Sequence, residues 1–213
     1  MTDSWGLWLR DTPRVASAAM WPARDLREES FAWIWEELAF GEAYTEERTL
    51  LQAHVEGRLM LDLGSGQPMA ARALATSLHA AAYAGVDLNH PLGHPASARQ
   101  AVDAASAVWG LPCMAVRADI MEVLCHLRAG PHAVVIGGID QDIVPDLNWH
   151  THLATQLLTV CSGGVAFCTE STVMTTLVKR GATPMALQFC AAQNAATEAL
   201  GGSWLGTAVL RLP

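Results

Sequence analysis

A group of glycines around residue 65, preceded by an acid, has the residue types and spacing of a ligand-binding loop. Asp62 stands before the pair Gly64 and Gly66 in the segment LMLDLGSGQPMAARALA, residues 59–75. Glycine has no Cβ, so it permits a sharp turn and lets a ligand approach the backbone closely. Pro68 suits a first helical position, where an amide hydrogen has no intrahelical partner. The segment therefore predicts a strand, a ligand loop and a helix in succession.

The acid before the glycines separates two classes of cofactor. A dinucleotide loop carries three glycines as G-x-G-x-x-G, and here Met69 stands at the third position. The pattern D-x-G-x-G does match, from Asp62 to Gly66. A carboxylate at this place can attract the ammonium group of a ligand, whereas it would repel a pyrophosphate. The loop thus favours a cofactor with an ammonium group, and a nicotinamide dinucleotide stays as an alternative.

The chain from residue 59 onward alternates between short apolar runs and helical stretches. We expect strands at 59–63, 83–87, 113–119, 132–138, 165–170, 187–191 and 204–212, and helices at 68–79, 96–109, 120–127, 149–160 and 173–179. This alternation is typical of a parallel sheet covered on both faces, which binds ligands at the carboxyl ends of its strands. We expect the last two strands to form an antiparallel hairpin, because no convincing helix separates them.

Residues 1–57 differ in character from the rest, with five tryptophans and frequent acidic pairs. Phe31, Ile34, Trp35 and Leu38 follow the spacing i, i+3, i+4, i+7 of one helical face. We therefore predict a helical N-terminal lid or extension at 1–57 and a cofactor-binding domain at 58–213. Trp35 lies on the apolar face, so we expect it to pack the extension onto the sheet domain.

Composition limits the partners and the location. The 213 residues suffice for one sizeable core, and no apolar run is long enough for a bilayer. We see no secretory signal and expect a cytoplasmic protein without a membrane partner. A net charge of −8 without a basic cluster argues against nucleic acid. The five cysteines lack metal-ligand spacing, so we expect reduced core thiols and no metal.

These features resemble the class I S-adenosylmethionine-dependent methyltransferases, over about residues 59–213. The resemblance implies an α/β, Rossmann-like, doubly wound sheet of seven mostly parallel strands. It also implies S-adenosyl-L-methionine (SAM) as the cofactor. The family's first motif usually continues to a third glycine, where this chain has Pro68.

The resemblance also suggests which residues hold the cofactor. They are Asp62, Gly64, Ser65, Gly66, Asp87, Leu88, Asp119, Ile120, Gly137 and Gly138. Asp87 would accept hydrogen bonds from the ribose hydroxyls, with Leu88 near the adenine. Asp119 would accept one from the adenine amino group, with Ile120 packed on the ring. Each aspartate taken alone is better explained as a helix N-cap, and the combination of all three favours the cofactor site.

The candidate catalytic residues follow the expected fourth strand. Methyl transfer from a sulfonium needs an aligned acceptor and a dry site, and a hydroxyl or amine acceptor also needs a base. His150, His152 and Asp140 are our candidates. Histidines at i and i+2 do not share a helical face, so at most one points into the site. For each histidine the alternative is a structural role at a helix start.

Our main hypothesis is a SAM-dependent methyltransferase that acts on a small, partly apolar metabolite, as in the O- or N-methylation of natural products. One alternative is a SAM-using enzyme that cyclises the aminobutyryl group and releases methylthioadenosine. An NAD(P)-dependent oxidoreductase and a non-catalytic binding protein on the same fold are two more. The acceptor is left open, as is assembly into a homodimer.

Overall fold

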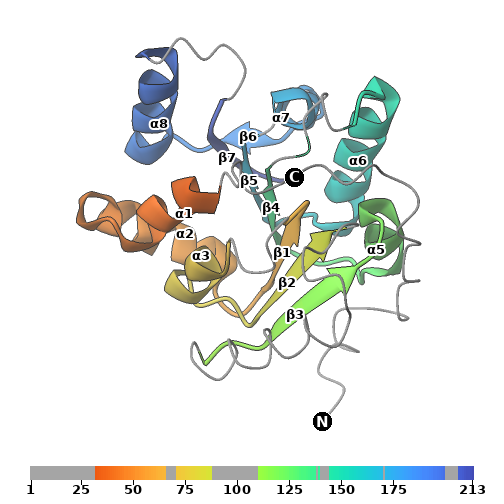
Figure 1. Cartoon of the computed structure of the whole chain (residues 1–213), viewed down its shortest axis with the longest axis horizontal. Helices are drawn as coiled ribbons and strands as arrows, with labels where there is room; N and C mark the ends of the chain where they lie inside the picture. The colour runs from red at the N-terminus through yellow and green to blue at the C-terminus, as the bar shows by residue number, and fades with distance from the viewer. Residues whose placement is uncertain are drawn as a thin grey trace.

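A mostly parallel sheet forms the centre of the molecule (Figure 1). The structure is a computed structural model that describes residues 32–65, 71–87, 110–137, 139, 144–169, 171–199 and 206–213. Its strands are β1 (Leu59–Leu63), β2 (Ala82–Asp87), β3 (Cys113–Arg117), β4 (Ala133–Ile136), β5 (Val165–Cys168), β6 (Thr183–Pro184) and β7 (Ala208–Arg211). Its helices are α1 (Ala32–Phe40), the 3-10 turn η2 (Glu42–Tyr44), α2 (Thr45–Val55), α3 (Arg72–Ser77), α5 (Ile120–His126), α6 (Leu147–Val160), α7 (Ser171–Lys179) and α8 (Gln188–Ala199).

The strand order is β3-β2-β1-β4-β5-β7-β6. β1 pairs in parallel with β2 on one side and β4 on the other, and β3 and β5 extend the parallel sheet outward. β7 runs antiparallel to both β5 and β6. The chain reverses its direction of winding at β1, so the carboxyl ends of β1 and β4 border the point where ligands bind in such sheets. The expected α/β class with a mostly parallel sheet is confirmed.

Strand residues alternate between two cores, one on each face of the sheet. On one face, Met60, Tyr83, Val135 and Phe167 are buried with α1, α2, α3 and α8. On the other, the alternate strand residues are buried with α5, α6 and α7. Figure 1 shows these two groups of helices on opposite sides of the sheet. The period of two along each strand therefore decides which helices a side chain meets.

The helices α1 and α2 share a core with the sheet. Trp35 is 2% exposed and meets Phe167 edge-on, with ring centroids 5.4 Å apart. Its ring also lies 5.9 Å from that of Phe189 on α8. Trp35 thus packs this segment onto the sheet, as the apolar helical face predicted. The division of the chain at residue 57 stays a prediction.

The expected strand at 187–191 is wrong, because this segment begins helix α8. The last strand pair is antiparallel as expected, yet it is not a hairpin, since α8 lies between β6 and β7. Two carboxylate contacts explain the helix: Glu47 of α2 accepts hydrogen bonds from the amides of Gln188 and Phe189. A short apolar run cannot by itself distinguish a buried strand from a buried helix.

Other expectations meet the structure in part. No helix within the described ranges is long and apolar enough to cross a membrane. Cys161, Cys168 and Cys190 are buried and outside any disulfide, as expected, whereas Cys125 is exposed. The helix expected at 96–109 lies outside the described residues.

Candidate functional site

The turn after β1 packs tightly against the turn after β4. Gly64 has φ of 74°, a backbone conformation that side chains with a Cβ rarely adopt. A Cβ on Gly64 would lie 3.1 Å from Cγ1 of Ile139 and 3.2 Å from the carbonyl oxygen of Gly137. The amides of Gly64 and Ser65 donate to the carbonyl of Val86 at 2.9 and 3.2 Å. Glycine is therefore favoured at position 64, because the backbone conformation strains other residues and the space for a Cβ is tight.

Ser65 contributes a buried hydroxyl that has no hydrogen-bond partner among the described residues. Its side chain is 5% exposed, and no described group donates to or accepts from its Oγ. Gly85 on β2 makes room for it, since a Cβ there would lie 3.1 Å from Ser65 Oγ and 3.4 Å from Tyr83 Oη. A buried hydroxyl without a partner costs free energy, so such a group is often satisfied by a ligand or an ordered water.

Asp62 is a buried acid beside this turn. It is 4% exposed, and Tyr83 Oη donates a 2.7 Å hydrogen bond to its Oδ2. The amide of Ala71 also donates to Oδ2, at 3.4 Å. Burial raises the pKa of Asp62 to about 6, an effect that these two hydrogen bonds partly offset and the charge of Asp87 reinforces. Near neutral pH the carboxylate is thus mostly ionised while lacking a cationic protein partner in the described chain.

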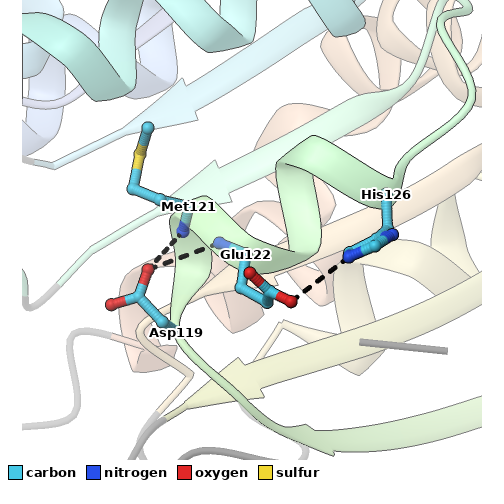
Figure 2. A network of polar contacts seen from close by, with 4 residues as sticks. All are labelled: Asp119, Met121, Glu122 and His126. Atoms are coloured by element: carbon cyan, nitrogen blue, oxygen red, sulfur yellow. Dashed lines mark hydrogen bonds and ion pairs between the residues drawn. The ribbon is translucent and has the colours of Figure 1, made fainter. Parts of the chain in front are cut away.

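The acids after β2 and β3 differ in their local role. Asp87 is the last residue of β2 and is half-buried. Asp119 caps α5, because its Oδ1 accepts from the amides of Met121 at 2.7 Å and Glu122 at 3.4 Å. In Figure 2 the second carboxylate oxygen of Asp119 points away from these amides. The N-cap interpretation is therefore confirmed for Asp119. Its second oxygen takes no part in the cap, so a contact between that oxygen and adenine stays a prediction.

Of the remaining predicted cofactor residues, the structure describes Ile120 and Gly137 but not the others. Ile120 is 7% exposed and belongs to the core beneath α5 and α6. Gly137 is half-buried, and a Cβ there would lie 2.9 Å from Thr169 Oγ1, so the chain is also close-packed after β4. The other predicted residues, Gly66, Leu88 and Gly138, lie outside the described residues, as does the catalytic candidate Asp140.

The two candidate histidines point in different directions from α6. His150 is fully buried, and its Nε2 donates a 2.7 Å hydrogen bond to the carbonyl of Val144. Its Nδ1 is buried and has no hydrogen-bond partner among the described residues. His152 is exposed. The two side chains occupy different faces, as their spacing predicted, and a role as general base stays a prediction for both.

Sequence reasoning missed Tyr83. It lies on β2 one strand away from Asp62, is fully buried, and forms that acid's shortest hydrogen bond. A tyrosine on a buried strand needs a partner for its hydroxyl, which was the available signal. The partner itself depends on the register between β1 and β2, which sequence alone did not provide.

The edge thus offers acids, an unpartnered hydroxyl and closely packed glycines, which suit a cationic ligand with hydroxyl and amino groups. Within the described ranges no group of three or more His, Cys, Asp or Glu side chains is arranged to hold a metal ion.

Comparison with known proteins gives only distant structural likenesses. No family model matches the chain, and no curated protein matches it. A putative methyltransferase, yhhF from Escherichia coli, aligns with 93% of this chain and 92% of its own, at 13% identity and a TM-score of 0.49. The [4+2]-cyclase SpnF aligns with 81% of this chain and 82% of its own, at 14% identity and a TM-score of 0.47.

A third solved structure is a putative rRNA-methylase from Clostridium thermocellum, at 8% identity, with 80% of this chain and 94% of its own aligned and a TM-score of 0.47. Of these three proteins, the first is described as a putative methyltransferase, the second as a cyclase and the third as a putative rRNA-methylase. At identities of 8–14% and TM-scores below 0.5, these likenesses assign neither a family nor a role to the chain, and the description of its fold rests on its own strand order.

Proposed function

We propose that the chain is a SAM-dependent methyltransferase that acts on a small, partly apolar metabolite. The observation that carries this proposal is the carboxyl edge of β1 and β2, where the ionisable Asp62 and the hydroxyl of Ser65 adjoin a glycine turn and Asp87 ends the next strand. The absence of a basic cluster from the sequence favours a small acceptor over a nucleic acid.

The residues at this edge fit SAM in chemical type. Asp62 would face the ammonium group of the methionine part, and Asp87 would accept hydrogen bonds from the ribose hydroxyls. The free oxygen of Asp119 would accept from the adenine amino group. When bound, SAM supplies an electrophilic methyl group on a sulfonium. The chain then has to orient the acceptor and exclude water.

The acids at this edge argue against a nicotinamide enzyme but do not separate a methyltransferase from a SAM-using cyclase. A nicotinamide dinucleotide would bring its pyrophosphate to the turn after β1, where the carboxylate of Asp62 opposes it. A SAM-using cyclase would need the same cofactor contacts as a methyltransferase, so the edge does not separate the two. The product does: methyl transfer leaves S-adenosylhomocysteine, and cyclisation leaves methylthioadenosine.

Calorimetric titration of the purified chain tests the cofactor. We expect SAM and S-adenosylhomocysteine to bind and NADH not to bind. Chromatography of incubations with SAM and a panel of small phenols and amines should then reveal S-adenosylhomocysteine. Binding of NADH without SAM would overturn the proposal, and accumulation of methylthioadenosine would replace methyl transfer by cyclisation.

A pair of capping aspartates gives a sharper test of the adenine end. Asp119 caps α5 and Asp146 caps α6, where its Oδ1 accepts from the amide of Asn148 at 2.9 Å. Asparagine is also a good N-cap, so both Asp→Asn variants should fold with little loss of stability. We expect Asp119→Asn to weaken SAM binding by about 1–3 kcal/mol, because an amide group cannot accept at both of its ends.

The control Asp146→Asn should bind SAM as the wild type does, because Asp146 serves only as a cap in this account. Equal SAM affinity for both variants in calorimetry would reduce Asp119 to a helix cap and remove the adenine contact from the proposed site.

A further inference from the structure

Tyr83 is the polar group nearest to Asp62 in the buried layer beneath α3. The two residues sit on neighbouring parallel strands, with Asp62 opposite Gly85 in the register of β1 and β2. Tyr83 precedes Gly85 by two positions, so both face the same side of the sheet as Asp62. Because Gly85 has no side chain, the phenol of Tyr83 and the acid can meet between the strands, and their oxygens are 2.7 Å apart.

The hydrogen bonds of Asp62 are unequally shared between its two oxygens. Both Tyr83 Oη and the amide of Ala71 donate to Oδ2. Among the described residues none donates to Oδ1. The carboxylate is thereby held in one orientation by a rigid strand on one side and the start of α3 on the other. Oδ1 is left as the oxygen available to a ligand.

We propose that Tyr83 is a positioning residue, which fixes Asp62 so that its second oxygen is presented to the ammonium group of the cofactor. This inference rests on the proposed function and extends it to a residue that does not itself touch the ligand. A hydrogen bond to a charged acceptor is short and strong, which suits a group that must hold an acid in place in the absence of ligand.

The charge state of the pair follows from its surroundings. Burial raises the pKa of Tyr83 well above its ordinary value, so its hydroxyl stays protonated and is always the donor. Its hydrogen bond lowers the pKa of Asp62, against the larger effect of burial. The other charged or titratable groups that act on the pair are Asp87 on Asp62, and Cys113 and Arg72 on Tyr83. Removal of the hydroxyl should therefore raise the pKa of Asp62 further.

The test is Tyr83→Phe, which deletes one oxygen and keeps the ring that fills the core. SAM affinity, measured by calorimetry across the range in which Asp62 ionises, should fall about tenfold at neutral pH. The pH below which affinity is lost should move upward from about 6, because ionised Asp62 is the binding form. A purely structural role for the hydroxyl would lower stability without moving this pH profile.

The chain supplies a matched control in its only other tyrosine. The hydroxyl of Tyr44 also faces a carboxylate, that of Glu37, at 3.5 Å and in an exposed setting. Tyr44→Phe should leave both the affinity for SAM and its pH profile unchanged. If Tyr83→Phe behaves like Tyr44→Phe, Tyr83 does not position the acid and the proposal is overturned.

A second measurement separates this inference from the proposed function. Isotope-edited infrared spectroscopy of Asp62 in the ligand-free protein should show its titration moving upward in Tyr83→Phe. If wild-type protein does not bind SAM, the function fails while the titration still tests the Tyr83–Asp62 coupling. Should Tyr83→Phe not fold, the double variant Asp62→Asn/Tyr83→Phe, which removes the buried charge, is expected to fold. Failure of that double variant to fold would show that Tyr83 acts on packing, against the proposal.

Discussion

Asp62 and Glu47 are both acids held by backbone amides, yet their surroundings differ. Glu47 uses both carboxylate oxygens on the first amides of α8, and the neighbouring Glu37 accepts a 2.6 Å hydrogen bond from Gln193. Asp62 is buried, keeps one oxygen without a described protein donor, and lies beside the unpartnered hydroxyl of Ser65. The acids between α1, α2 and α8 are thus satisfied by the fold, whereas the edge of β1 retains unused hydrogen-bonding capacity.

The comparison shows that satisfied and unsatisfied polar groups lie in different parts of one sheet, and the proposed function places ligand binding at the unsatisfied part. Fully satisfied polar groups and packed aromatic rings lower the free energy of the folded state. Buried groups that lack partners raise it, and proteins keep such groups mainly where a ligand uses them. Removal of a satisfied or packed group should therefore lower stability, whereas neutralisation of the buried acid Asp62 should raise it.

The largest effect is expected at the aromatic contact between α1, the sheet and α8. Trp35→Ala removes a ring that is 2% exposed and packed on Phe167 and Phe189. The free energy of unfolding in urea should fall by about 3–5 kcal/mol, because a large cavity remains. Phe40, which is 57% exposed, is the control, and Phe40→Ala should change it little. Similar losses for both variants would contradict the packing described for α1.

Asp62→Asn should raise the free energy of unfolding near neutral pH, whereas Trp35→Ala lowers it. The pKa of Asp62 is raised from 3.8 to about 6 in the folded protein, so the folded state ionises later than the unfolded one. The wild type therefore loses stability as the pH rises from about 4 to about 6, and the loss persists above that range. Near neutral pH the variant should be more stable by up to about 3 kcal/mol.

Urea unfolding at several pH values checks this prediction. The advantage of Asp62→Asn should vanish only well below pH 3.8, where the wild-type acid is protonated in both the folded and the unfolded state, and SAM binding should be lost throughout. A difference between the two proteins that does not vary with pH would show that Asp62 is not a buried, ionising acid.

Gly64→Ala should lower stability by about 2–3 kcal/mol, in part through its positive φ and in part through the close approach of Ile139 and Gly137. Gly57 has a similar φ of 72°, and a Cβ added there would meet no atom within 4 Å. Gly57→Ala therefore measures the cost of the positive φ alone, and should lower the free energy of unfolding by about 1–2 kcal/mol. If thermal or urea unfolding shows equal losses of stability for Gly64→Ala and Gly57→Ala, the turn after β1 is not closely packed around position 64.

The smallest effect is expected for the cap of α8. Glu47→Gln replaces the carboxylate that receives the amides of Gln188 and Phe189, and should cost about 1 kcal/mol. Glu46→Gln on the same helix turn is the control, since Glu46 is exposed. Affinity for SAM should be unchanged in both variants. A loss of affinity in Glu47→Gln would link α8 to the ligand site and weaken the separation between the two regions.

The sequence predicted what short-range pattern determines. Alternating apolar runs located β1 to β5, and the residues Asp62 and Gly64 were placed correctly at the end of a buried strand. The spacing of His150 and His152 predicted that they diverge, but only packing decided that His150 is the buried one.

Long-range contacts account for what was missed. The cap of α8 comes from Glu47, 141 residues before Gln188, so the local sequence around residue 188 showed only an apolar run. The bond between Tyr83 and Asp62 spans 21 residues and depends on the register of two strands. Neither pairing can be obtained from periodicity within one segment.

The most direct test of the account is a crystal structure of the chain with S-adenosylhomocysteine, the product form of the proposed cofactor. We predict the ligand at the carboxyl edge of β1 and β2, with its amino group on Oδ1 of Asp62 and its ribose hydroxyls on Asp87. A complex in which the ligand lies elsewhere, or in which neither acid touches it, would contradict the assignment of this edge as the cofactor site.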